Sequence, residues 1–137
     1  MPHSTQAQST DTAYRVILSD PQGHTWHADE PESAGGADTA PNPFQVLLSA
    51  LGACTTVTLQ MYAKRKQWPL QAIHVDLTLN PAGDPKPGTG AANVIARAIR
   101  LSGDLDDEQR QRLLQVANAC PVHKLLEGGM EIVTALV

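Results

Sequence analysis

Strand-like segments recur at five places in the chain: residues 13–19, 24–29, 72–80, 92–101 and 130–137. The alternation of apolar and polar residues that marks a half-buried strand is clear at 92–101, where Ile95, Ile99 and Leu101 share one face. Between the first two segments, Asp20-Pro21-Gln22-Gly23 has the residues of a tight turn, with proline second and glycine fourth. This turn predicts that the first two segments form a β-hairpin.

Three other segments carry helix signals: residues 43–66, 107–119 and 121–126. Asn42 can cap the first helix, a proline suits its first position, and Gln45 can complete a capping box. Asp106 caps the second helix in the same way. The Cys120-Pro121 pair ends the second helix and starts the third.

The first helix is apolar or small on every side over residues 46–59. A helix of this kind is expected to be buried all round. Gly52 costs helix stability, so its presence predicts close packing at that point. Because one chain of 137 residues can hardly enclose such a helix, we expect a homodimer with this helix near the interface.

The order of the elements is hairpin, long helix, two strands, helix, short helix and strand. This order predicts an α+β fold with a mainly antiparallel sheet. Residues 1–12 are polar and predict a disordered tail, and residues 13–137 predict a single domain. Residues 30–41 form a loop that is long for a compact domain, and long loops are often functional.

Charge and composition exclude some classes of function. The formal net charge is −4 and the pI is about 5.6, which argues against nucleic-acid binding. The basic cluster at residues 64–66 instead complements a helix C-terminus. The N-terminus has no signal-peptide pattern, and no uninterrupted apolar stretch predicts a membrane span, so we expect a cytoplasmic protein.

The chain contains two cysteines, Cys54 and Cys120, and thiols in the cytosol are kept reduced. Cys120 precedes a helix, and a helix N-terminus lowers the pKa of a thiol. Cys54 has no charged neighbour in sequence. Spacing alone also allows two inert core cysteines. A zinc site is a weaker alternative, because Cys120 and His123 lack a second ligand pair.

Four segments of the chain resemble the OsmC/Ohr family: Asp29-Glu30-Pro31 with Gly35-Gly36, Asn42-Pro43 with residues 47–55, Met61-Tyr62-Ala63 with Lys66, and Ala119-Cys120-Pro121-Val122-His123. The resemblance covers roughly residues 13–137. It implies an intertwined homodimer of the OsmC-like branch, in which two long central helices are wrapped by mainly antiparallel sheets. It also shifts the interpretation of the cysteines from inert to redox-active.

The resemblance implies a thiol-dependent peroxidase, an oxidoreductase of the antioxidant stress response that reduces organic hydroperoxides in preference to inorganic ones. Cys54 would attack the peroxide and become a sulfenic acid, and Cys120 would condense with it to a disulfide. A dithiol reductant would restore the thiols. The family implies no metal and no organic cofactor, and no nucleic acid or membrane is expected as a partner.

The chain departs from the family at an acidic position that holds an activating arginine in the best-studied branch. Here Phe44 occupies that position, followed by Gln45. Arg15 is the only arginine before residue 65, so it is the N-terminal candidate for the activating cation. Phe44, Gln45, Met61 and His123 are the expected substrate-binding residues, and His123 could also donate a proton or tune Cys120.

Two other functions compete with the peroxidase. The loss of the acidic residue favours an OsmC-like binding module for an apolar ligand or partner, with weak peroxidase activity. An inert structural dimer is the third alternative, in which the cysteines contribute only to stability.

Overall fold

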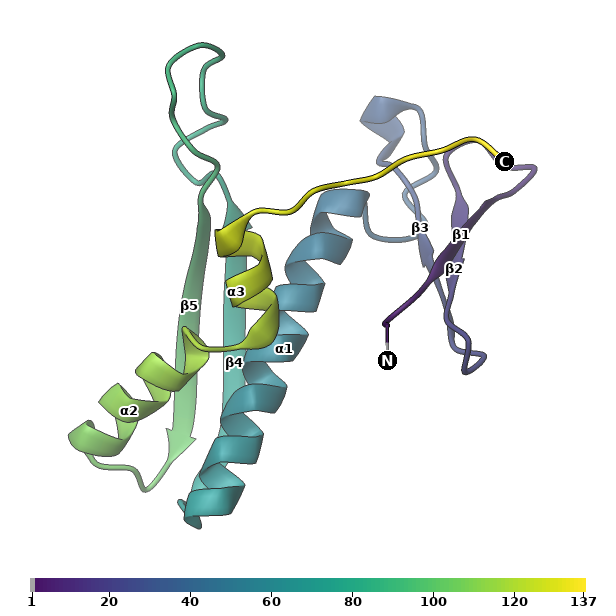
Figure 1. Ribbon diagram of the computed structural model, residues 1–137. Coiled ribbons are helices and arrows are strands. Elements are labelled where there is room, and N and C mark those ends of the chain that lie inside the picture. Colours follow the sequence, from purple (N-terminus) through teal and green to yellow (C-terminus); the bar gives the residue numbers. More distant parts are fainter. Residues whose placement is uncertain (1) are drawn as a thin grey trace. The chain divides into compact units, whose positions relative to one another are not determined.

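The computed structural model describes residues 2–137, which form two compact units, residues 2–47 and residues 48–137 (Figure 1). The predicted single domain over residues 13–137 stays a prediction. The fold class is confirmed: helices accompany two antiparallel sheets in an α+β arrangement. The structure contains a single chain, and the predicted homodimer stays a prediction.

The first unit contains an antiparallel sheet of β1 (Gln6–Ser9), β2 (Val16–Ser19) and β3 (Thr25–Ala28). The predicted hairpin is present, and the N–H of Gly23 donates to the carbonyl of Asp20 over 3.1 Å in its turn. The prediction of a disordered tail is wrong for β1. All β1 side chains are exposed, so backbone pairing with β2 rather than burial holds this strand.

The loop after β3 is organised by the buried carboxylate of Asp29. It accepts hydrogen bonds from the N–H of Glu30 (2.8 Å) and from the N–H and hydroxyl of Thr39 (3.0 and 2.6 Å). The Thr39 hydroxyl, and then these N–H groups, stabilise the ionised form and lower the pKa of Asp29 to about 2. Gly36 is required nearby, because a Cβ there would lie 2.0 Å from the carbonyl oxygen of Glu30.

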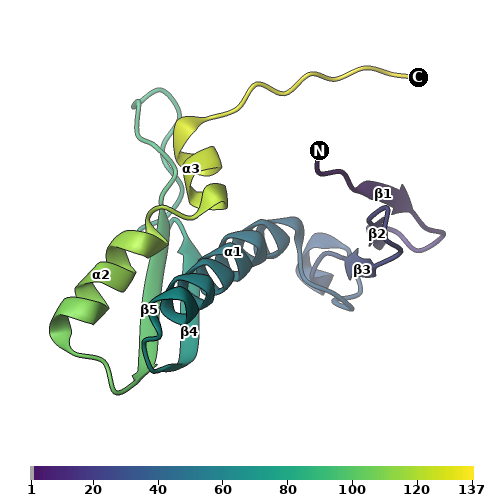
Figure 2. The same ribbon diagram turned by 60° about the horizontal axis from the view of Figure 1, so that its bottom comes forward.

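The second unit is built on a hairpin of two long strands, β4 (Leu70–Leu79) and β5 (Ile95–Gly103). The long helix α1 (Pro43–Lys66) begins in the first unit and runs alongside this hairpin (Figures 1 and 2). After β5 the chain forms α2 (Asp107–Ala117) and α3 (Pro121–Gly128). The bounds of α1 agree with the prediction, because the expected capping box forms: the N–H of Gln45 donates to Asn42 Oδ1 over 2.9 Å.

The core of the second unit lies where α1 and α2 cover one face of the hairpin. It consists of buried aliphatic side chains: Leu59, Leu105, Leu113, Val116 and Ala117. Alternate strand residues such as Ile73 and Ile99 pack against it. Gly52 allows α1 to approach β4 closely, since a Cβ at this position would lie 2.9 Å from Leu77 Cδ1.

The single chain buries α1 on one side only, so its burial all round, expected for the homodimer, stays a prediction. Its buried residues follow one stripe: Leu51, Thr55, Leu59 and Ala63. The opposite side carries exposed or half-buried apolar and small residues at alternating spacings of three and four, which we call the outer seam: Leu47, Ala50, Cys54, Val57 and Met61. By length and composition alone α1 could also cross a membrane, a property that it shares with core helices of soluble proteins.

The prediction of a final strand at residues 130–137 is wrong for this chain. This segment is extended but forms no strand, and its apolar side chains are open, with Ile132 86% exposed. A strand requires a neighbouring edge for its backbone hydrogen bonds. Within residues 2–137 no strand pairs with this segment.

Candidate thiol redox site

The fold brings the two cysteines together. Cys54 lies at mid-length on α1 and is half-buried, whereas Cys120 is the N-cap residue of α3 and is fully buried. The hairpin and α2 return the chain to α1, so residues that are far apart in sequence become neighbours (Figure 1). The two side chains hydrogen-bond to each other, and both thiols are free.

Both sulfurs accept hydrogen bonds from the first turn of α3. The N–H of Val122 donates to Cys54 Sγ over 3.5 Å, and the N–H of His123 donates to Cys120 Sγ over 3.3 Å. These N–H groups have no partner inside the helix because they belong to its first turn. Pro121 occupies the first helical position, as predicted, where its missing N–H costs nothing. The helix N-terminus therefore favours negative charge on either sulfur.

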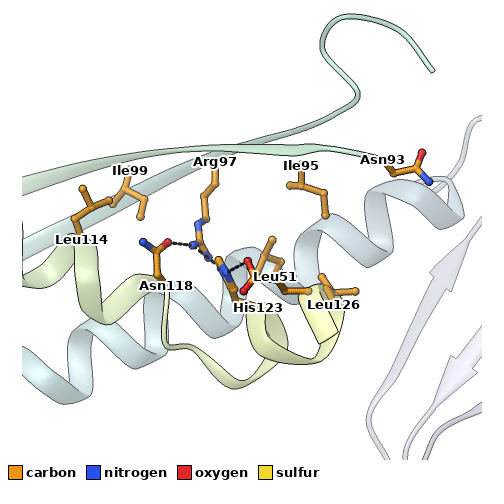
Figure 3. A pocket seen from close by; sticks show the side chains of 10 residues that line it. Leu51, Asn93, Ile95, Arg97, Ile99, Leu114, Asn118, His123 and Leu126 are labelled. Carbon is orange, nitrogen blue, oxygen red and sulfur yellow. Dashed lines mark hydrogen bonds and ion pairs between the residues drawn. The ribbon is translucent and has the colours of Figure 1, made fainter. Parts of the chain in front are cut away.

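A guanidinium completes the site. Arg97 of β5 donates hydrogen bonds to Thr55 Oγ1 of α1 (2.9 Å), to Asn118 Oδ1 (3.0 Å) and to His123 Nδ1 of α3 (2.9 Å). Figure 3 shows the last two of these contacts as dashed lines. All three partners are neutral acceptors, and none of the ion pairs among residues 2–137 involves Arg97.

The surroundings of Cys120 favour its thiolate. Burial disfavours the charged form and by itself raises the pKa of Cys120. The hydrogen bonds of its sulfur with the His123 N–H and with the Cys54 and Thr55 side chains act in the opposite direction, as does the charge of Arg97. Together these contacts lower the pKa of Cys120 below that of an ordinary thiol.

A pocket of about 410 Å³ shares Arg97, Asn118 and His123 with the thiol site as part of its polar wall, and neither cysteine is among its lining residues (Figure 3). Most of the remaining lining is aliphatic: Leu51, Ile95, Ile99, Leu114 and Leu126. An apolar pocket with a few converging polar groups is typical of a small-molecule site. This site suits an apolar molecule whose reactive end meets the polar wall.

The structure brings only some of the predicted site residues together. Cys54, Cys120 and His123 lie together, and His123 lines the pocket. Met61 is 67% exposed on the outer seam and Phe44 is 63% exposed, so in this chain neither walls the pocket. In Gln45 the side-chain oxygen accepts the N–H of Asn42 at the start of α1. The substrate-binding roles of these three residues stay predictions.

Arg15 is held inside the first unit. Its guanidinium donates to the Thr39 hydroxyl, which in turn donates to the buried carboxylate of Asp29. Cys54 belongs to the second unit, so the activating role assigned to Arg15 from the sequence stays a prediction. Among residues 2–137 there is also no cluster of three or more His, Cys, Asp or Glu side chains suited to a metal ion.

Sequence analysis missed Arg97, Thr55 and Asn118. A signal for Arg97 was present: it falls between Ile95 and Ile99 in the period of two, on the face of β5 that turns toward α1. A charged residue at an inward position is rarely buried without a partner. Thr55 and Asn118 had no comparable signal, because threonine in an apolar helix and asparagine at a helix end are both common.

Two hydrogen-bonded thiols at a helix start, with an arginine beside them, define a protein of the two-cysteine thiol class on an α+β scaffold. The sequence matches the family described as OsmC-like protein over residues 35–135. The chain belongs to this family, which confirms the resemblance seen in the sequence. No curated protein is significantly similar to the chain.

Solved bacterial structures share the fold. An OsmC-like protein from Mycoplasma pneumoniae is 18% identical, with a TM-score of 0.77 over 93% of this chain and 89% of that one. The organic hydroperoxide resistance protein OsmC from Legionella pneumophila is 18% identical, with a TM-score of 0.67 over 93% and 90%. The organic hydroperoxide resistance protein OhrB of Bacillus subtilis is 22% identical, with a TM-score of 0.59 over 90% and 89%. At these identities the likeness establishes the fold alone.

Proposed function

We propose that this protein is a thiol-dependent peroxidase that reduces organic hydroperoxides and serves in peroxide stress. The observation that carries the proposal is the Cys54–Cys120 pair, hydrogen-bonded at the start of α3 next to Arg97. Family membership and the hydroperoxide resistance named for similar structures support a role in peroxide stress. The aliphatic pocket supports an organic substrate rather than hydrogen peroxide alone.

The reaction proceeds in three steps. The Cys54 thiolate attacks one oxygen of the O–O bond, which breaks; with one proton the products are a Cys54 sulfenic acid and an alcohol. Cys120 then attacks the Cys54 sulfur, forming a disulfide and releasing water. A dithiol reductant is finally oxidised to its own disulfide by exchange, and both thiols are restored.

Exposure supports the assignment of the two roles. In the single chain Cys120 is fully buried, whereas Cys54 is half-buried, which favours Cys54 as the thiol that meets the peroxide. Cys120, whose thiolate the site favours, acts as the base: it takes the proton of Cys54 through the hydrogen bond between the thiols and leaves Cys54 as the nucleophile. The N–H of Val122 and the charge of Arg97 stabilise the negative pair during this transfer.

The direct test measures consumption of cumene hydroperoxide with dithiothreitol as reductant. The wild type is expected to turn over and Cys54→Ser to be inactive, whereas Cys120→Ser treated with peroxide without dithiothreitol is expected to stop at the Cys54 sulfenic acid. Mass spectrometry of peroxide-treated wild type is expected to find a Cys54–Cys120 disulfide. Undiminished turnover by Cys54→Ser would rule out the mechanism.

A binding module for an apolar ligand is the second candidate. It is favoured by Gln45, which stands near the expected acidic position and serves as a helix cap. In this case peroxide leaves both thiols unchanged, and a medium-chain alcohol such as octanol raises the melting temperature. Rapid formation of the Cys54–Cys120 disulfide counts against this candidate.

We further propose that the protein is a cytoplasmic homodimer. The outer seam of α1 has the alternating three- and four-residue spacing of a helix–helix contact. Val57 and Met61 on this seam are 47% and 67% exposed in the single chain, which favours a second copy as their cover.

A further inference from the structure

The imidazole of His123 joins the arginine of the thiol site to a carboxylate. Its Nδ1 lies 2.9 Å from Arg97 Nη2 (Figure 3). Its Nε2 lies 3.1 Å from Glu127 Oε2. The ring is mostly covered, with 20% of its side chain exposed, whereas the Glu127 side chain is 77% exposed. His123 is therefore held at both nitrogens.

The chemistry of the partners determines the form of the ring. A guanidinium carries only donors, so Nδ1 must accept from Arg97 and carries no proton. The single ring proton then lies on Nε2 and is donated to the Glu127 carboxylate. The observed contacts thus require the neutral Nε2–H tautomer.

We propose that His123 is a positioning residue that holds Arg97 beside the thiol pair only while its ring is neutral. This inference rests on the proposed thiol function. His123 of α3 and Asn118 accept from one guanidinium nitrogen, Nη2, and Thr55 accepts from the other, Nη1. Protonation of Nδ1 would place a second positive charge against Arg97 and replace an attraction with a repulsion.

The charged and titratable groups around the ring are few. Arg97 faces it from β5, Glu127 from its own helix, and the thiols of Cys54 and Cys120 lie at the start of that helix. From α2 the pocket receives Leu114 and no charge. Of these groups Arg97 disfavours a protonated ring, whereas Glu127 and a cysteine thiolate favour one, and the exposure of Glu127 weakens its effect. The ring proton is thus coupled mainly to Arg97 and the thiols.

The test measures thiolate formation without peroxide. Ultraviolet thiolate absorbance is followed against pH in the wild type, His123→Leu and His123→Asn, and the Cys120→Ser variant identifies the transition of Cys120. His123→Leu removes the acceptor and is expected to raise the Cys120 transition by about one pH unit, the lower end of the effect of a nearby arginine. His123→Asn keeps an acceptor oxygen for Arg97 and is expected to recover more than half of this change.

His74→Asn is the matched control, because His74 is an exposed histidine of β4 that pairs with Asp76. It should titrate like the wild type. Equal titration of His123→Leu and the wild type overturns the proposal, and so does an equal rise in His123→Asn and His123→Leu, which would indicate ring packing instead.

Nitrogen-15 spectra of the wild-type ring give an independent check that needs no variant to fold. The Nε2–H tautomer is expected, and a proton on Nδ1 at neutral pH overturns the proposal. Neither measurement uses peroxide. If the titration is as expected but the protein does not turn over peroxide, only the peroxidase proposal is contradicted.

Discussion

Arg97 keeps its charge available because its partners are neutral. A carboxylate partner would neutralise the guanidinium, whereas a hydroxyl, an amide oxygen and an imidazole nitrogen only orient it. The positive charge can then act on Cys120, where it favours the thiolate. The sequence offered Arg15 as the cation, and the structure adds a second candidate on β5.

Thr55 is the residue of α1 that accepts a hydrogen bond from Arg97. Its fully buried hydroxyl accepts from Arg97 over 2.9 Å and donates to the Leu51 carbonyl over 2.7 Å. Thr55→Val keeps the shape but leaves a guanidinium donor without its acceptor. We expect the free energy of unfolding to fall by about 1 to 3 kcal/mol and the pKa of Cys120 to rise.

Urea denaturation and thiolate absorbance measure these two effects. Thr56→Val is the matched control, since the Thr56 hydroxyl bonds only to the carbonyl of Gly52 over 2.9 Å. If both variants change the Cys120 titration equally, Thr55 has no specific role in holding Arg97.

Asp29 predicts a pH dependence for the first unit. Its folded pKa of about 2 lies below the value of about 3.9 for an unfolded aspartate. Its stabilisation is therefore fully present above roughly pH 4 and is lost as the pH falls through about 2. Asp29→Asn should remove this dependence and lower stability at neutral pH.

Urea unfolding from pH 2 to pH 6, a range chosen around these pKa values, measures the dependence of stability on pH. Asp38→Asn in the same loop is the control, because among residues 2–137 its carboxylate accepts no hydrogen bond. A wild-type profile for Asp29→Asn would contradict the prediction.

At the scale of elements, helix α2 depends on its cap. The N–H of Gln109 donates to Asp106 Oδ1 over 2.7 Å, and the N–H of Asp106 donates to Gln109 Oε1 over 2.9 Å. Asp106→Ala removes the side-chain acceptor and is expected to cost about 1 kcal/mol of unfolding free energy. Thermal or urea denaturation measures this loss.

Asp107→Ala is the comparison for the cap, since Asp107 follows in the first turn and contributes through the helix dipole alone. We expect it to cost less than Asp106→Ala. An equal loss in both variants would mean that charge rather than the capping box stabilises this end of α2.

Elements with local signals were predictable from the sequence. The caps Asn42 and Asp106 and the Cys120-Pro121 junction predicted the starts of α1, α2 and α3, because these signals act within a few residues. Strand β1 was missed because its side chains are all exposed, so no apolar pattern marked it. The prediction for residues 130–137 failed for the opposite reason. This segment has the residues of a strand, but among residues 2–137 no strand edge pairs with it.

The site was predictable only in part, for a related reason. The two cysteine motifs are local and could be recognised, but the meeting of Cys54 and Cys120 depends on the path of the chain between them. Arg97 reaches the site through the pairing of β4 with β5 and the packing of α1 on that hairpin. No spacing in the sequence carries this information.

At the scale of the whole molecule, the single chain leaves two apolar surfaces uncovered. One is the outer seam of α1, and the other is the segment at 130–137. A soluble monomer rarely exposes contiguous apolar surface of this kind. Both features follow if the seam packs against α1 of a second copy and the final segment adds to a sheet of that copy.

Val57 gives the sharpest test of this dimer, because it occupies the outer seam next to Cys54 and is 47% exposed. A glutamate there would place an unpaired charge in the helix–helix contact, and burying such a charge is costly. We expect sedimentation velocity to give a dimer for the wild type and a monomer for Val57→Glu at the same concentration. Gln60→Glu, an exposed polar position of the same helix, should remain a dimer. If Val57→Glu sediments like the wild type, the seam is not the interface.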